Sequence, residues 1–161
     1  MVVVVMGVTG AGKTTVGSLL AKQLGWEFRD ADQFHTPANI EKMSHGIPLN
    51  DADRAPWLAA MHDSIVKWLA NGENVVLACS ALKRSYREEL CVDPRVKLIY
   101  LKGSIELISE RVRERQGHYA KADLVSSQFA DLEEPEGAIT EDVSHTPEEI
   151  VTEARKRLGL T

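Results

Sequence analysis

The sequence predicts an α/β fold: a three-layer, doubly wound parallel sheet of about five strands in a single domain, residues 1–161. Three observations predict it. Apolar, β-branched segments alternate about five times with segments of helical periodicity, as in parallel sheets covered by helices on both faces. The first apolar segment runs directly into a glycine-rich turn and a helix. The length suits one domain, and no internal repeat or low-complexity tract divides it.

The first strand and the first helix have the clearest patterns. Residues 1–6, MVVVVM, form a continuous apolar run that is typical of a strand buried on both faces. The sequence GVTGAGKT follows at once. Apolar side chains then recur at helical spacing from Val16 to Leu24, and Gly25 is a typical helix stop.

The middle of the chain is expected to hold two strands and two helices. WEFRD, residues 26–30, predicts a second strand with a polar end, and NIEKMSHG, residues 39–46, predicts a short helix closed by its final glycine. Residues 51–72 repeat apolar side chains at helical spacing and end at an Asn-Gly pair. NVVLAC, residues 74–79, is the third predicted strand.

The next segments supply the remaining strands. Ser80 is a candidate cap for a helix that runs to about Leu90. VKLIYL, residues 96–101, predicts the fourth strand, and Ser104 is a candidate cap for the helix after it. AITEDV, residues 138–143, predicts a fifth, weaker strand.

The C-terminal helix has a capping signal at its start, whereas the segment between the fourth and fifth strands has no clear pattern of secondary structure. TPEE, residues 146–149, predicts a capping box with proline at the first helical position. Residues 116–135 are expected to form a loosely packed excursion between the fourth and fifth strands. The region around residues 115–128 is polar and contains Gly117, and it is predicted to be a lid.

Composition and charge exclude several classes of protein. The hydrophobic fraction of 43% and the charged fraction of 27% are those of an ordinary globular chain. The net charge of −5 disfavours a nucleic-acid-binding face. The longest apolar run, residues 1–6, lacks a basic flank and is far shorter than the roughly 20 residues that span a bilayer, so no membrane segment is expected. Cys79 and Cys91 form no metal-binding or disulfide pattern, which favours a reducing compartment, the cytoplasm.

The segment GVTGAGKT matches the phosphate-binding pattern G-x-x-x-x-G-K-[ST]. Glycines let backbone amides turn toward the phosphates, and the start of the following helix adds positive potential. Lys13 would reach the outer phosphates, and the hydroxyl of Thr14 would bind Mg²⁺. The strand before the motif and the helix after it are the context that a nucleotide site requires. The predicted ATP-binding residues of this loop are Gly7, Val8, Thr9, Gly10, Ala11, Gly12, Lys13, Thr14 and Thr15.

A phosphate loop does not by itself reveal the fate of the γ-phosphate. A small-molecule kinase, a GTPase switch and a non-catalytic nucleotide-binding module all compete. The chain contains neither N-K-x-D nor D-x-x-G, which a GTPase needs. The third predicted strand runs into ACSALK, whereas the apolar strand of a motor-type ATPase ends in acidic residues. A kinase is therefore favoured, and it needs an acceptor pocket beside the γ-phosphate.

The segment RDADQFH, residues 29–35, supplies candidates for that pocket. The second strand would deliver Asp30 and Asp32 to the edge of the sheet where ligands bind, with both carboxylates on one side because side chains alternate along a strand. One carboxylate could hold hydrated Mg²⁺ while the other accepts a proton or hydrogen bond from the attacking hydroxyl. His35 is a candidate substrate contact. A solvated strand end is the structural alternative.

Several segments together resemble the gluconate kinases, in the shikimate-kinase-like branch of the nucleoside-monophosphate-kinase-type P-loop proteins. They are GVTGAGKTT, DADQFH, NIEKMSHGIPLNDADRAPWL, CSALKRSYR, YLKG and GHY…SQF…LEEP, and they reach to about Pro135. The resemblance implies transfer of the ATP γ-phosphate to the 6-hydroxyl of D-gluconate. It also suggests a homodimer. The alternatives are a kinase of another small hydroxy acid, such as shikimate, whose Gly-Gly-Gly motif is absent here, and a non-catalytic sensor of ATP and a sugar acid.

The resemblance also implies roles for individual residues. It places Asp30 on the Mg²⁺ side and Asp32 on the acceptor side. Arg111 and Arg115 match positions that flank adenine and enter the lid, and Lys13, Asp32 and Arg115 are the predicted catalytic residues. The residues in acceptor-pocket motifs are Asp32, His35, Lys42, Arg54, Ser80, Lys83 and Gln128. Gluconate needs a cation for its carboxylate, and Lys42, Arg54 and Lys83 remain open as candidates.

Overall fold

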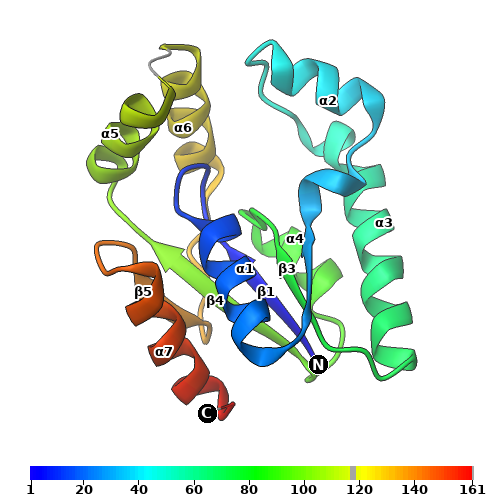
Figure 1. Ribbon diagram of the computed structural model, residues 1–161. Coiled ribbons are helices and arrows are strands. Elements are labelled where there is room, and N and C mark those ends of the chain that lie inside the picture. The colour runs from blue at the N-terminus through cyan, green and yellow to red at the C-terminus, as the bar shows by residue number, and fades with distance from the viewer. Residues whose placement is uncertain (117–118, 161) are drawn as a thin grey trace.

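The molecule is built on one five-stranded parallel sheet with strand order β2-β3-β1-β4-β5 (Figure 1). The computed structural model describes the backbone of residues 1–116 and 119–160, and the side chains of residues 1–114 and 124–160. The strands are β1 (Val2–Met6), β2 (Glu27–Asp30), β3 (Val75–Ala78), β4 (Val96–Lys102) and β5 (Ile139–Asp142). The predicted fold class and the five predicted strands are therefore confirmed.

The central strand β1 pairs with β3 on one side and β4 on the other. Val2 lies opposite both Val75 and Val96, so these three strands run in register from the same starting edge. All five residues of β1 are buried, as the β-branched run predicted.

Helices cover both faces of the sheet. They are α1 (Lys13–Leu24), α2 (Pro37–Ser44), α3 (Asp51–Ala70), α4 (Arg84–Leu90), α5 (Ile105–Gln116), α6 (Tyr119–Asp131) and α7 (Pro147–Leu158), with a 3₁₀ turn η1 (Ala31–Phe34) after β2. Alternate residues of β1 point to opposite faces. Val2 and Val4 pack with α3 and α4, whereas Val3 and Val5 pack with α1, α5 and α7.

Several helices begin or end at the residues that the sequence predicted. Gly25 ends α1 in the left-handed conformation, with φ of 70°. Ser104 Oγ accepts a hydrogen bond from the amide of Leu107 at the start of α5. Thr146 and Glu149 form the predicted capping box of α7, with Pro147 in its first turn.

Two predictions about the chain after β3 and β4 are wrong. Ser80 does not cap a helix, because the backbone turns at Ala81 with φ of 44° and α4 begins only at Arg84. The amide of Arg84 donates instead to Glu133 Oε1, at 2.9 Å. The stretch expected to be a loose excursion contains the helix α6, which packs against α5.

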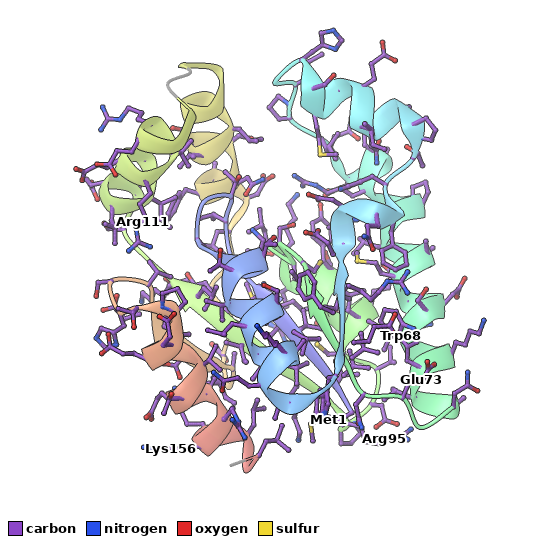
Figure 2. All side chains as sticks on the ribbon, viewed as in Figure 1. Met1, Trp68, Glu73, Arg95, Arg111 and Lys156 are labelled. Atoms are coloured by element: carbon purple, nitrogen blue, oxygen red, sulfur yellow. The ribbon has the colours of Figure 1, made fainter. Side chains whose placement is uncertain are left out.

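The two ends of the sheet differ in character. At the amino end, Met1, Glu73 and Arg95 lie close together (Figure 2), and backbone hydrogen bonds join Val2 to Arg95 and Val75 to Met1. At the carboxyl end, β1 runs into the phosphate loop, β2 into η1 and α2, and β4 into α5 (Figure 1). The polar candidates of the sequence collect at this carboxyl end, as expected for an open parallel sheet.

Candidate active site

The phosphate loop joins β1 to α1 and has the backbone that its glycines allow. Gly10 and Gly12 have φ of 81° and 95°, in the left-handed region that L side chains rarely adopt. A Cβ on Gly10 would lie 2.6 Å from Val112 Cγ2, so the turn also depends on a close approach to α5. α1 begins at Lys13 and directs its free amides and positive dipole end toward the loop.

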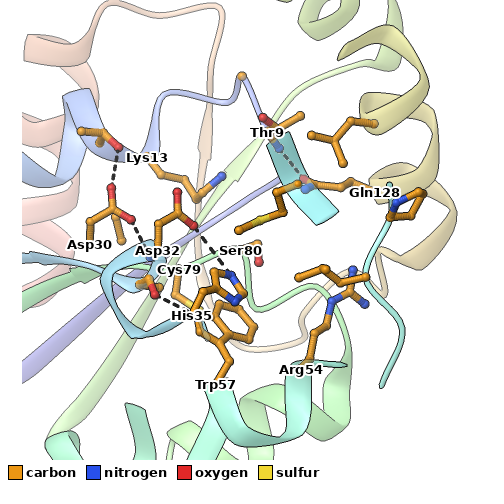
Figure 3. A pocket seen from close by; sticks show the side chains of 18 of the residues that line it. Thr9, Lys13, Asp30, Asp32, His35, Arg54, Trp57, Cys79, Ser80 and Gln128 are labelled. Carbon is orange, nitrogen blue, oxygen red and sulfur yellow. Dashed lines mark hydrogen bonds and ion pairs between the residues drawn. The ribbon is translucent and has the colours of Figure 1, made fainter. Parts of the chain in front are cut away.

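Lys13 extends from this turn toward two carboxylates (Figure 3). Its Nζ donates to the carbonyl oxygen of Val8 at 3.0 Å. Burial lowers the pKa of Lys13, and the nearby carboxylates of Asp32 and Asp30 oppose that shift. The ammonium is thus held inside the site at the place where the outer phosphates of a nucleotide would lie.

Asp30 and Asp32 both face this site, but not for the reason the sequence suggested. β2 ends at Asp30, and Asp32 belongs to the turn η1, so the two carboxylates are not successive residues on one face of a strand. Asp30 caps the turn: its Oδ1 accepts from the amide of Asp32 at 3.0 Å. Its Oδ2 accepts from the hydroxyl of Thr14 at 3.2 Å. Asp30 therefore belongs with the phosphate loop, and Asp32 is exposed to the cavity beyond it.

Asp32 and His35 stand on either side of an open space. His35 Nε2 lies 3.9 Å from Asp32 Oδ1, and the imidazole stacks on Trp57 with ring centroids 4.5 Å apart. Burial and the charge of Asp30 raise the pKa of Asp32. Burial, with the positive charge of Arg54, lowers the pKa of His35 to about 4, so the imidazole is neutral near pH 7.

A cavity of about 320 Å³ opens between the phosphate loop, α2, α3 and α6. It is lined by polar and apolar residues together, as is typical of a small-molecule site. The lining includes Thr9, Gly10, Gly12, Lys13, Thr14, Thr15, Asp30, Asp32, His35, Arg54, Trp57, Cys79, Ser80 and Gln128. Five predicted acceptor-pocket residues, Asp32, His35, Arg54, Ser80 and Gln128, are thus brought together here (Figure 3).

Arg54 is the predicted carboxylate-binding cation that lines this cavity. The residue is 8% exposed, and its Nη1 donates to Tyr86 Oη at 3.0 Å and to Asp131 Oδ2 at 3.2 Å. Tyr86 Oη also contacts a carboxylate oxygen of Asp51. These bonds hold one end of the guanidinium, and a planar donor group held in this way suits a carboxylate ligand.

Lys42 and Lys83 do not line the cavity. Lys42 Nζ is bound by Asp53 at 2.9 Å and Lys83 Nζ by Asp51 at 2.9 Å, so each ammonium already has an acidic partner. Their predicted role in substrate binding stays a prediction.

Gln128, on α6, contacts the phosphate loop directly. Its Oε1 accepts a hydrogen bond from the amide of Thr9 at 2.6 Å, across a long separation in sequence. The side chain of Arg115, the predicted catalytic arginine of the lid, lies outside the described residues, and so does part of the predicted lid, residues 117–118.

A second cavity, of about 400 Å³, lies on the other side of the phosphate loop. Arg111 lines it, and the Nη2 of Arg111 donates to the carbonyl oxygen of Val143 at 2.6 Å. Pro147 and Gly12 contribute to the same walls. The two cavities share Gly10, Gly12 and Thr15, so an extended ligand could reach from one to the other past the loop.

The donor set beside the loop suits a hydrated Mg²⁺ ion bound with phosphates. The hydroxyl of Thr14 and the carboxylate of Asp30 are oxygen ligands of the kind Mg²⁺ prefers when it keeps several waters. Within the described residues no group of three or more His, Cys, Asp or Glu side chains could hold a metal by itself. A metal here would depend on nucleotide phosphates for its remaining ligands.

Sequence reasoning missed several residues of this site. Trp57 is one of the apolar residues at helical spacing in residues 51–72; it is buried as that spacing suggests, but it also lines the cavity and stacks on His35. Asn39, 2% exposed, contacts His35; it begins the resemblance segment NIEKMSHGIPLNDADRAPWL, but the sequence alone assigned it no role. Tyr86 and Asp131 hold Arg54 from distant helices, which a linear pattern cannot indicate.

Comparison with known proteins identifies relatives along nearly the whole chain. The family model described as shikimate kinase matches residues 9–158. A gluconokinase of Gluconobacter oxydans is 51% identical over 82% of this chain and 75% of its own length. A probable gluconokinase of Xenopus tropicalis is 42% identical over 99% of this chain and 96% of its own. A crystal structure of a gluconokinase from Sinorhizobium meliloti superposes with a TM-score of 0.88 and 44% identity, covering 98% of this chain and 90% of that one.

Fold, site and relatives define an ATP-dependent P-loop kinase that phosphorylates a hydroxyl group of a small molecule. The chain belongs to the gluconokinase family, as the sequence resemblance predicted. None of the described helices has the length and apolar composition that crossing a membrane requires.

Proposed function

We propose that the protein transfers the γ-phosphoryl group of ATP to the 6-hydroxyl of D-gluconate, giving 6-phosphogluconate and ADP. The observation that carries this proposal is the cavity beside Lys13, which offers the carboxylates Asp30 and Asp32 at one end and the guanidinium of Arg54 at another, in a chain of the gluconokinase family. Gluconate is an acid with a row of hydroxyl groups, and it presents a matching arrangement. Arg54 is assigned to its carboxylate and Asp32 to the 6-hydroxyl.

The proposed mechanism is positioning combined with charge stabilisation. Lys13 and the amides of the phosphate loop bind the transferring group, and Asp32 accepts the hydroxyl proton as the new P–O bond forms. Mg²⁺, when bound by Thr14 and Asp30, would neutralise phosphate charge. Arg111 would lie against the adenine base in the second cavity. A homodimer in the cytoplasm is proposed as well, and the free thiols of Cys79 and Cys91 support a reducing compartment.

The test is an assay of ADP release over a panel of acceptors: gluconate, other aldonates, shikimate and nucleoside monophosphates. Gluconate should be turned over fastest, with an absolute need for Mg²⁺. A matched Lys13→Ala variant should lose roughly 10²-fold or more in turnover, as for removal of one positioned electrostatic donor. Lys22→Ala, on the exposed side of the same helix, is the control. Faster turnover of shikimate or AMP would overturn the assignment.

A non-catalytic sensor of ATP and a sugar acid is the alternative from another class. It would bind gluconate and ATP without releasing ADP. Calorimetric binding measured beside the assay separates the two, because a sensor gives heats of binding with no turnover.

A further inference from the structure

The environment of His35 defines which of its two ring nitrogens carries the proton. Nδ1 lies 3.3 Å from the side-chain nitrogen of Asn39, and Nε2 faces Asp32 across 3.9 Å. A neutral imidazole has one donor and one acceptor nitrogen, and the partner of one nitrogen determines the state of the other. The question is therefore which atom Asn39 presents to Nδ1.

A second contact of Asn39 answers it. Its Nδ2 also lies 2.7 Å from the backbone carbonyl oxygen of Asp53, in the first turn of α3. A carbonyl oxygen only accepts, so the amide nitrogen, not the amide oxygen, must point in this direction. That nitrogen has two hydrogens, and Asp53 and His35 provide two acceptors. His35 Nδ1 must then be the unprotonated nitrogen.

The surroundings of Asn39 keep this orientation in place. Asn39 is 2% exposed, and its backbone amide donates to Thr36 Oγ1, the N-cap of α2. The imidazole is held flat against Trp57, at an interplanar angle of 7°. Turning the Asn39 amide would break its buried hydrogen bonds to Asp53 and His35, which is costly.

We propose that Asn39 is a positioning residue that holds His35 in the Nε2–H tautomer, so that His35 donates a hydrogen bond to the acceptor hydroxyl of the substrate. The separation of 3.9 Å between Nε2 and Asp32 Oδ1 is too long for a direct hydrogen bond. A hydroxyl oxygen that lies in the cavity, to one side of the line between these two atoms, can reach both of them, accepting from Nε2–H and donating to Asp32. With that donor fixed, the hydroxyl hydrogen is directed toward the carboxylate that receives it.

The tautomer can be measured without substrate. In ¹⁵N NMR spectra of the full chain near pH 7, two-bond couplings assign the protonated nitrogen of each histidine. The parent protein should show His35 protonated at Nε2. In Asn39→Asp the new carboxylate can only accept, so His35 should become protonated at Nδ1. A parent with Nδ1–H, or an Asn39→Asp variant that keeps Nε2–H as its only protonated nitrogen, would overturn the proposal.

A matched variant distinguishes positioning of His35 by Asn39 from a general stabilisation of α2. Thr36→Ala removes the cap of α2 but leaves the Asn39 amide, so it should lower stability and keep the Nε2–H tautomer. Should Asn39→Asp fail to fold, the spectrum of the parent alone still decides whether the proposed tautomer is present.

The kinetic part rests on the proposed function. Asn39→Asp should lower kcat/KM for gluconate by about tenfold or more, as for one hydrogen bond to the substrate, with little change in KM for ATP. In a His35→Gln background the same change should add little, because no tautomer remains to be set. An equal loss in both backgrounds would contradict the role of Asn39. If gluconate is not phosphorylated at all, the spectra still test the tautomer independently.

Discussion

At the scale of single residues, Asp30 and Asp32 have different neighbours, which implies different roles. Asp30 accepts from Thr14 and from a backbone amide, whereas the Asp32 carboxylate lines the cavity in which the acceptor would bind. Asp30→Asn should therefore weaken the response to Mg²⁺, so that extra metal partly restores turnover. Asp32→Asn should lower kcat by about 10²–10⁴, as for loss of a general base, with ATP affinity little changed. Titrating both variants with Mg²⁺ beside the parent distinguishes them, and rescue of Asp32→Asn by metal would reverse the assignment.

His35 should make the stability of the protein depend on pH. Its pKa is about 4 in the folded protein and near 6.5 when unfolded, so the unfolded chain binds the extra proton first as the pH falls. The contribution of neutral His35 is complete above pH 6.5 and is lost between about 6.5 and 4. One pKa unit corresponds to about 1.4 kcal/mol and the two pKa values differ by about 2.5 units, so a loss on the order of 3 kcal/mol is expected across this window.

Denaturant unfolding at pH values from 7 to 4 measures this contribution. In His35→Gln the free energy of unfolding should fall less over the window than in the parent. His45→Gln, at an exposed position, is the matched control. Parallel pH profiles for the parent and His35→Gln would show that His35 does not titrate in this way.

Single residues were predicted best from the sequence where their function requires a fixed spacing along the chain. The phosphate loop has a spacing that backbone geometry requires, so Lys13 and Thr14 could be located in advance. Asp32 was assigned to the cavity although its supposed place on a strand was wrong, because η1 turns it to the same side. Asn39 could not be recognised, since its partners, His35 and Asp53, meet only after α2 packs on α3.

At the scale of elements, the close contact between the phosphate loop and α5 requires glycine at position 10. Gly10→Ala adds a Cβ 2.6 Å from Val112 Cγ2 and forces a positive φ on alanine. Gly72 also has positive φ, 68°, but a Cβ there meets nothing within 4 Å. We expect Gly72→Ala to cost about 1–2 kcal/mol for the backbone alone, and Gly10→Ala about 2–5 kcal/mol because overpacking is added.

Urea unfolding of both alanine variants compares these costs, and calorimetry with ATP measures the effect on the site. Gly10→Ala should weaken ATP binding, whereas Gly72→Ala, at the end of α3, should leave it unchanged. Equal destabilisation by the two variants would show that the phosphate loop accommodates the added Cβ next to Val112 without extra loss of stability.

Elements with strong local signals were predicted well, and those that depend on tertiary contacts were not. The capping box at Thr146 is encoded within four residues, so the start of α7 was correct. α4 begins late because Arg87 donates to the carbonyl oxygens of Ala81 and Leu82, holding that stretch outside a helix. α6 was taken for a loose segment because its sequence is polar, yet Val125 is fully buried against the sheet face that α1 covers.

At the scale of the whole molecule, the homodimer suggested by the family resemblance is open to a direct test. One chain has a mass of 17.8 kDa. Light scattering of the purified protein at micromolar concentration should give twice that mass. The same measurement over a series of dilutions is the control, since the mass of a non-specific aggregate grows with concentration while a stable dimer keeps its mass. A monomer mass throughout would contradict the prediction.

The pairing of β1 has a consequence for how the chain is made. β1 is translated before its two partner strands, because Val2 pairs with Val75 of β3 and Val96 of β4. At a synthesis rate of roughly 5–20 residues per second, the valines of β1 remain unpaired for several seconds until β3 has been synthesised. Such a run is apolar, β-branched and uncharged, and it is therefore prone to aggregate while it is unpaired. Refolding from denaturant should therefore lose yield as the protein concentration rises, and changing one valine of β1 to threonine should ease that loss at the expense of native stability.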